Sequence, residues 1–202
     1  SLYLNGVKLE SITAEQLSGI TEIKSFAFSG WNGVSIEIPE SITSIGDYAF
    51  SGWDGTSIEI PESITSIGDY AFNKCSSLTS VTIPSNVTSI GAGVFGGCTS
   101  LTRVNITNLK AWCNMDFDAR SLTNTNNPLV YAHSLYLNGV KLESITAEQL
   151  SGITEIKSFA FSGWNGVSIE IPEGVTSVSE YVFSECRSLT SIEIPESITS
   201  IG

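Results

Sequence analysis

The chain has 202 residues, 41% of them apolar, and carries a formal net charge of -12 at pH 7. That apolar share is enough to bury a core, which excludes wholesale disorder. With 21 acidic and only 9 basic residues the chain lacks a basic patch for nucleic acid, and no run approaches the roughly 20 apolar residues of a membrane span.

The first predicted element is a β-hairpin. Residues 2–9 alternate around Asn5-Gly6, which is the strongest short-range hairpin signal. The same segment returns at residues 135–142, because residues 1–40 and 134–173 are identical at an offset of 133 (134 − 1). Chance does not produce such identity, so the chain contains a duplicated unit.

Shorter repeats follow the hairpin. Segments 41–62, 63–85, 86–107 and 174–196 share one motif, in which Thr107 replaces the proline of the other copies. The spacing is 22 and 23 residues across Pro39, Pro61 and Pro84, and again 23 from Pro172 to Pro195. A period in this range is typical of leucine-rich repeats.

One coil shows how the repeat folds. Alternation across Val81, Thr82 and Ile83 points the apolar side chains inward and the threonine outward, as in a strand. Pro84 ends that strand because it has no N–H to donate. The return path carries a second apolar pair, and Gly91 permits a turn there.

Since one coil cannot cover its own apolar side chains, its neighbours must cover them. We therefore predict a mostly-β, α/β-type repeat solenoid: a right-handed leucine-rich-repeat coil with one parallel strand per 22–23 residues. Short turns or 3₁₀ segments are expected on the return side.

Two side-chain ladders are predicted inside the coils. Phenylalanine holds one place in six coils, namely Phe28, Phe50, Phe72, Phe95, Phe161 and Phe183. Three residues later comes a tryptophan or a cysteine: Trp31, Trp53, Cys75, Cys98, Trp164 or Cys186. Exchange of Trp for Cys indicates one buried site filled in two ways, rather than platforms for stacking sugars.

Residues 108–133 break the pattern. Asn108 is placed to cap a short helix from Leu109 to Phe117, and Thr123 to Pro128 is typical of a loop. Trp112 is expected to be partly exposed. We interpret this island as a spacer, so that residues 1–107 and 134–202 are two hairpin-and-repeat blocks. The chain stops at Gly202 within another repeat motif, so we expect the natural protein to continue.

The tandem pattern resembles the BspA-like leucine-rich repeat family of bacterial surface proteins. The resemblance rests on the Ile-Pro strand ends, the Ser-Ile-Gly returns and the Cys-x-Ser-Leu-Thr-Ser strand starts. The segment 108–113, followed by Leu-Tyr-Leu-Asn-Gly, is similar to the spacer of such proteins. The resemblance implies an extracellular or cell-surface protein that takes part in adhesion, with a host or microbial surface or matrix protein as its ligand.

A row of outward side chains is the candidate binding site. In the middle of the strands stand Glu37, Glu59, Thr82, Asn105, Glu170 and Glu193, which stacking would align on one polar face. Like charges side by side are mildly destabilising. Two explanations stay open: a solvated face that protects the sheet from sticking, and a surface that binds a protein or calcium.

Residues for catalysis are sparse. Cys75 and Cys98 share one repeat position, within disulfide reach, but the Trp found there in other coils favours free packing thiols. No Cys-x-x-Cys or Cys/His pairing offers a zinc site. His133 is one histidine in a spacer, where a surface or structural role is favoured over a general base.

We therefore predict no catalytic residue, no metal and no cofactor. The patterns favour a non-catalytic protein-interaction module that uses the repeat sheet or its flanks. The alternative is a purely structural stalk, because exact duplication adds reach without new chemistry.

Overall fold

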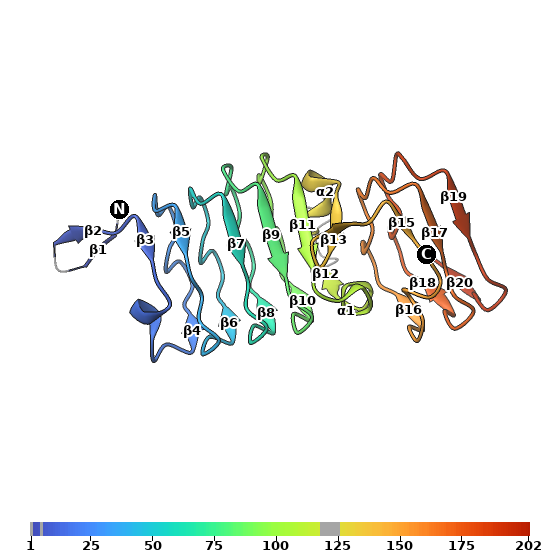
Figure 1. The fold of residues 1–202 in the computed structure, drawn as a ribbon, viewed down its shortest axis with the longest axis horizontal. Coiled ribbons are helices and arrows are strands. Elements are labelled where there is room, and N and C mark those ends of the chain that lie inside the picture. Colours follow the sequence, from blue (N-terminus) through green and yellow to red (C-terminus); the bar gives the residue numbers. More distant parts are fainter. Residues whose placement is uncertain (1, 5, 118–125) are drawn as a thin grey trace.

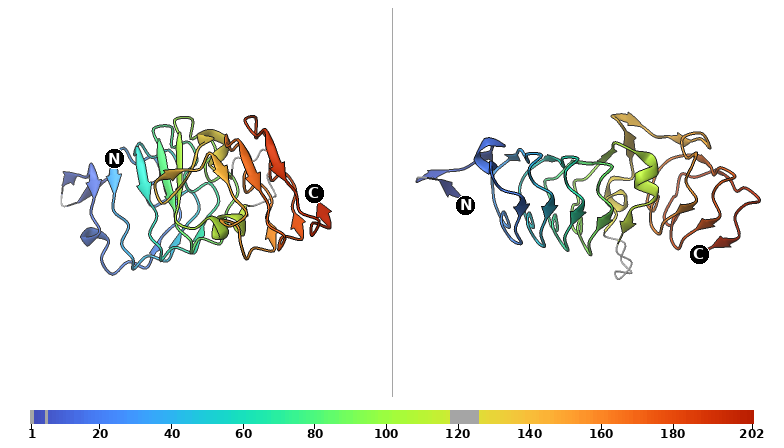
Figure 2. Two further views of the ribbon diagram at one scale, coloured as in Figure 1. Left: turned by 45° about the vertical axis from the view of Figure 1, so that its right-hand side comes forward. Right: turned by 90° about the horizontal axis from the view of Figure 1, so that it is seen from below.

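The chain forms an elongated stack of coils (Figure 1). We describe it from a computed structural model, which covers residues 2–4, 6–117 and 126–202. A hairpin projects from the amino-terminal end of the stack, and the carboxyl terminus lies in the last coils at the other end (Figures 1 and 2).

The coils of the first block, with the spacer and the first strand of the second block, form two parallel rows of strands, which we call the front and the back. The front strands are β3 (Ser11–Ile12), β5 (Ser35–Ile36), β7 (Ser57–Glu59), β9 (Ser80–Ile83), β11 (Arg103–Ile106) and β13 (Leu135–Leu137). The back strands are β4 (Glu22–Ile23), β6 (Ser44–Ile45), β8 (Ser66–Ile67), β10 (Ser89–Ile90) and β12 (Asp116–Phe117). All neighbouring pairs in these sheets are parallel, apart from the hairpin described below.

The second block repeats this arrangement. Its front strands are β15 (Ser144–Ile145), β17 (Ser168–Glu170) and β19 (Ser191–Glu193), and its back strands are β16 (Glu155–Ile156), β18 (Ser177–Val178) and β20 (Ser200–Ile201). The mostly-β repeat solenoid is thus confirmed. The back strands are the one difference, since turns or 3₁₀ segments were expected there. They form because the backbone groups beside the buried return isoleucines need partners on the next coil.

Both predicted hairpins are present. β1 (Tyr3–Leu4) pairs antiparallel with β2 (Val7–Lys8), and β13 pairs antiparallel with β14 (Val140–Lys141). Asn5, in the turn of the first hairpin, lies outside the described residues. Only the second hairpin extends a sheet, because β13 also pairs with β11.

The two predicted ladders form the core. Phe50 stacks between Phe28 and Phe72, with ring centroids 5.3 and 5.2 Å away and planes nearly parallel. Trp53, Cys75, Cys98 and Trp164 are fully buried, as a shared packing site requires. One cluster of buried residues runs from Ile12 to Val182, so the core is continuous through the spacer.

Close stacking explains the repeated glycines. A Cβ at Gly91 would lie 2.8 Å from the backbone nitrogen of Asp69 in the preceding coil. The predicted turn follows Gly91 directly, and a larger residue is excluded at Gly91 by the close approach of the preceding coil. The left-handed residue comes two places later, at Gly93 (φ 61°), where earlier coils use Tyr48 (φ 55°) and Tyr70 (φ 57°).

The spacer forms part of the solenoid. Helix α1 (Leu109–Cys113) begins at Asn108, whose side chain accepts a hydrogen bond from the Ala111 amide, so the predicted cap is confirmed. The helix is shorter than expected because Asp116 and Phe117 join the back sheet as β12. Of the loop expected from Thr123 to Pro128, residues 123–125 lie outside the described residues.

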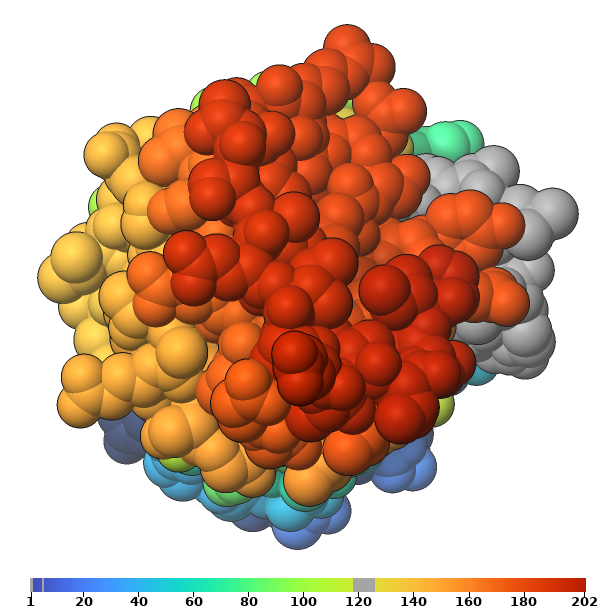
Figure 3. Space-filling view, turned by 90° about the vertical axis from the view of Figure 1, so that its right-hand side faces the viewer, coloured from blue at the N-terminus to red at the C-terminus, as the bar shows by residue number. Residues whose placement is uncertain are grey.

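A second spacer helix, α2 (Leu129–Ala132), leads into β13. The expectation that Trp112 is partly exposed is wrong. Trp112 is 1% exposed, because α1 packs it against Phe117 and the first coil of the second block. Viewed from the carboxyl-terminal end, the atoms of the last coils cover the end of the solenoid (Figure 3).

Candidate binding face and the pocket beside the spacer

The outward side of the front strands is the candidate binding face, and we call it the front face. Strand register aligns Glu59 with Thr82 and Thr82 with Asn105. In the second block Glu170 is aligned with Glu193. The structure therefore brings five of the six predicted site residues into rows, one per coil within each block. Glu37 follows β5, which pairs with β3 and not with β7, so no strand register aligns it with Glu59.

Two of the glutamates have a structural task. A carboxylate oxygen of Glu37 accepts a hydrogen bond from the Ala14 amide at 3.3 Å, and Glu170 accepts one from the Ala147 amide at 3.2 Å. Ala14 precedes the 3₁₀ helix Glu15–Leu17, whose first amides lack partners within the helix. These two carboxylates hold the turn of the preceding coil. Of the four glutamates predicted on the front face, Glu59 and Glu193 are therefore the two whose carboxylates have no described backbone partner.

The middle of the front face differs from its ends. Asn105 accepts a hydrogen bond from the Gly139 amide at 2.8 Å, so its side chain anchors the β13–β14 hairpin. The Arg103 guanidinium lies 4.1 Å above the ring of Tyr136, which is the register partner of Asn105. A cation–π pair thus separates the acidic end at Glu59 from the acidic end at Glu193.

Sequence reasoning missed Arg103 and Tyr136 as residues of the front face. The signal was present in part, because Arg103 replaces the serine that begins other front strands. Tyr136 follows the spacer rather than a repeat, so its place in the same sheet as Asn105 depends on the path of the spacer.

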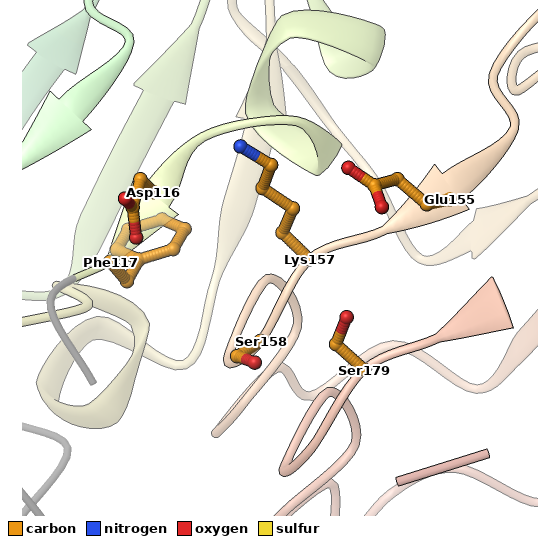
Figure 4. Close-up of a pocket in the computed structure, with 6 residues that line it drawn as sticks. All are labelled: Asp116, Phe117, Glu155, Lys157, Ser158 and Ser179. Carbon is orange, nitrogen blue, oxygen red and sulfur yellow. The ribbon is translucent and has the colours of Figure 1, made fainter. Parts of the chain in front are cut away.

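A polar pocket lies where the back sheet is interrupted between β12 and β16. It has a volume of about 280 Å³ and is lined by Asp116, Phe117, Glu155, Lys157, Ser158 and Ser179 (Figure 4). The Lys157 side chain extends between the carboxylates of Asp116 and Glu155 (Figure 4). In the identical first copy Lys24 instead forms an ion pair with Glu22 at 2.7 Å.

The pocket holds one cation, two carboxylates and two hydroxyls. Among the six described residues that line it, no nucleophile is paired with a base, which is what acyl or phosphoryl transfer would need. Within residues 2–4, 6–117 and 126–202, no group of three or more His, Cys, Asp or Glu side chains is placed to hold a metal ion.

No helix in the described part of the chain is long and apolar enough to cross a membrane.

The cysteines are free thiols. The Sγ atoms of Cys75, Cys98 and Cys186 each donate to a phenylalanine carbonyl of the preceding coil, at 3.0–3.1 Å. Burial raises the pKa of the Cys186 thiol to about 11 and that of Cys113 further. Cys113 and Cys186 are therefore protonated packing groups near neutral pH.

His133 has a structural role. It ends α2 in a left-handed conformation (φ 55°), and its Nδ1 lies 2.8 Å from the carbonyl oxygen of Gly163. Because a carbonyl only accepts, Nδ1 carries the proton in this contact. His133 thus joins the spacer to the second block.

Sequence comparison finds one family. The family model for the BspA-type leucine-rich repeat region matches residues 1–123 and 131–202, in six copies. No curated protein matches the chain.

Solved bacterial structures share the fold. A leucine-rich repeat protein of T. pallidum is 26% identical, with a TM-score of 0.51 over 98% of this chain and 75% of that one. A leucine-rich repeat protein of Eubacterium ventriosum is also 26% identical, with a TM-score of 0.53 over 96% of this chain and 50% of that one. The pneumococcal vaccine antigen PcpA is 20% identical, with a TM-score of 0.52 over 93% of this chain and 51% of that one.

Proposed function

Because the chain belongs to the BspA-type leucine-rich repeat family, we propose that it is a non-catalytic protein-interaction module that binds a protein partner through its front face. The proposed partner is a host or microbial surface or matrix protein, and the proposed location is the cell surface or the extracellular space.

The observation that carries this proposal is the alignment of polar and charged side chains on the front face. Ser57, Ser80 and Arg103 form one row, and Glu59, Thr82 and Asn105 form the next. Such a flat surface makes many shallow contacts with a large ligand, whereas small molecules bind in enclosed pockets. Weak contacts that repeat on successive strands together increase the affinity, as they do in multivalent binding.

The partner chemistry follows from the charges. The acidic ends at Glu59 and Glu193 favour basic side chains, and the Arg103–Tyr136 pair in the middle offers a ring and a guanidinium to an acidic or aromatic group. The matching partner surface would carry an acidic or aromatic group in its middle, facing the Arg103–Tyr136 pair. Basic groups on either side would face Glu59 and Glu193.

The experiment is surface plasmon resonance of the immobilised chain against a panel of purified extracellular-matrix proteins. For a protein that binds, Glu59→Gln with Glu193→Gln should weaken affinity at least fivefold. The matched control is Glu155→Gln with Glu180→Gln, which changes the net charge equally at two acids on the back side of the solenoid, one in β16 and one just after β18. Equal loss in both double variants would contradict a front-face site.

A stalk is the second candidate function. The continuous core through the spacer favours it, because the two blocks are joined by packing rather than by a flexible linker. Absence of binding across the whole panel would favour the stalk over the interaction module.

A further inference from the structure

The amino-terminal end of the second block is covered by the spacer. This end, which we call the entry surface, is joined to both spacer helices and the segments beside them by backbone and side-chain hydrogen bonds. The indole N–H of Trp112 donates to the Ala160 carbonyl at 2.7 Å, and the Asn127 amide donates to the Phe159 carbonyl at 2.6 Å. The Lys157 amide donates to the Cys113 carbonyl at 2.9 Å, and the Asn165 amide to the His133 carbonyl at 2.8 Å.

Apolar contact accompanies these bonds. Phe159 is 4% exposed and Ile153 is 3% exposed beneath the spacer. A Cβ on Gly163 would lie 2.8 Å from the Leu129 carbonyl oxygen, so α2 sits directly against the backbone of this coil. The spacer and the entry surface therefore fit each other closely.

The first block has the same entry surface without a cover. Its residues 1–40 are identical to 134–173. Phe26, the equivalent of Phe159, is 60% exposed, and Ile20, the equivalent of Ile153, is 40% exposed. Within the described residues, the amides of Lys24 and Asn32 have no hydrogen-bond partner.

The uncovered surface already has the conformation of the covered one. Phe26 and Phe159 are both left-handed, with φ of 63° and 67°. The indole N–H groups of Trp31 and Trp164 make the same bond to the preceding turn, at 3.1 and 3.2 Å. Binding at the first entry surface would therefore need little rearrangement, which lowers its cost.

We propose that the entry surface of the first block, formed by Ile20, Lys24, Phe26, Ala27, Gly30 and Asn32, is a docking site for a segment with the sequence of residues 108–133. Trp112 of that segment would donate to the Ala27 carbonyl, and its Asn127 to the Phe26 carbonyl. Its carbonyls at Cys113 and His133 would accept from the amides of Lys24 and Asn32.

The choice of occupant rests on the second block, where this segment is seated on an identical surface. An unrelated protein partner would have to match four separate hydrogen-bonding groups and the exposed ring of Phe26, which its left-handed backbone positions. The consequence is a unit of 133 residues whose spacer, at its carboxyl-terminal end, fits the entry surface of another copy of the same unit. Successive units would then join in series through one type of interface. This inference concerns the end of the solenoid and does not depend on ligand binding by the front face.

The test is an extended chain in which a copy of residues 63–133 is joined directly before Ser1, reproducing the native junction between His133 and Ser134. Amide hydrogen exchange is measured by NMR, because peptides from the identical segments cannot be told apart by mass. The amides of Lys24 and Asn32 should slow at least 100-fold and approach those of Lys157 and Asn165.

The matched control is the same extension with Trp112→Ala and Asn127→Ala in the added copy only. It should leave Lys24 and Asn32 exchanging within a few fold of their rates in the 202-residue chain. Unchanged exchange with the unmodified extension, including the case where the added copy stays unfolded, would overturn the proposal. Equal protection with both extensions would overturn the assigned contacts.

Discussion

The first and last thirds of the chain hold the same 40-residue sequence in two environments. Phe159 is buried and Phe26 is exposed, although both stack on a tyrosine of the next coil. Lys24 pairs with Glu22, whereas Lys157 extends into a pocket beside the spacer. The comparison shows that the sequence of a coil determines its local conformation. The neighbouring segments determine which of its side chains are buried and which ion pairs form.

The largest expected effect is removal of the cover over the second copy. Trp112→Ala deletes a fully buried indole and leaves the Ala160 carbonyl without its main donor. We expect the free energy of unfolding to fall by about 4–5 kcal/mol, measured by denaturant titration. A loss below about 1 kcal/mol would contradict the close packing of the spacer.

A smaller effect separates the two equivalent phenylalanines. Phe159→Ala should destabilise the chain by about 3 kcal/mol, because it opens a cavity under the spacer. Phe26→Ala at the exposed end should cost less than about 1 kcal/mol. Both sites have the same left-handed backbone, so each variant controls for strain in the other. Equal losses in thermal or chemical unfolding would argue that burial does not distinguish the copies.

The equivalent glycines test the close approach of α2. Gly30 and Gly163 both have positive φ, so alanine strains the backbone at each. Only at Gly163 does the new Cβ meet the Leu129 carbonyl, while at Gly30 it meets open space. Gly163→Ala should therefore be the less stable variant by about 1–2 kcal/mol in the same unfolding assay. The opposite order would contradict the contact.

The smallest effect concerns thiol chemistry and leaves stability unchanged. Cys98 and Cys186 hold the same place in different coils, but Cys186 is partly exposed in the last one. Alkylation by iodoacetamide, followed by mass spectrometry, should modify Cys186 first. Because its pKa is raised to about 11, its rate should increase about tenfold per pH unit up to that pH. A plateau near pH 9 would contradict the raised pKa.

The repeat period made much of the fold predictable. The phenylalanine and Trp/Cys ladders follow from position alone, because stacked coils place equivalent residues above one another. The Asn108 cap and both hairpins follow from local signals. The back strands were missed because two residues are too few for an alternation pattern, and their pairing is set by the neighbouring coil.

The candidate site was less predictable. Strand alternation predicts that Glu37 and Glu170 point outward, but it does not show that their carboxylates reach the amides of Ala14 and Ala147 in the preceding coil. The burial of Trp112 likewise depends on how the spacer packs against a segment nearly 50 residues later. Both contacts join residues far apart in sequence, where local patterns carry no information.

The most direct measurement of the central claim is amide hydrogen exchange of the two identical segments within the unmodified chain, resolved by NMR. The account predicts that the amides of Lys157 and Asn165, which bond to the spacer, exchange at least 100-fold more slowly than those of Lys24 and Asn32. Equal exchange rates in the two copies would contradict it.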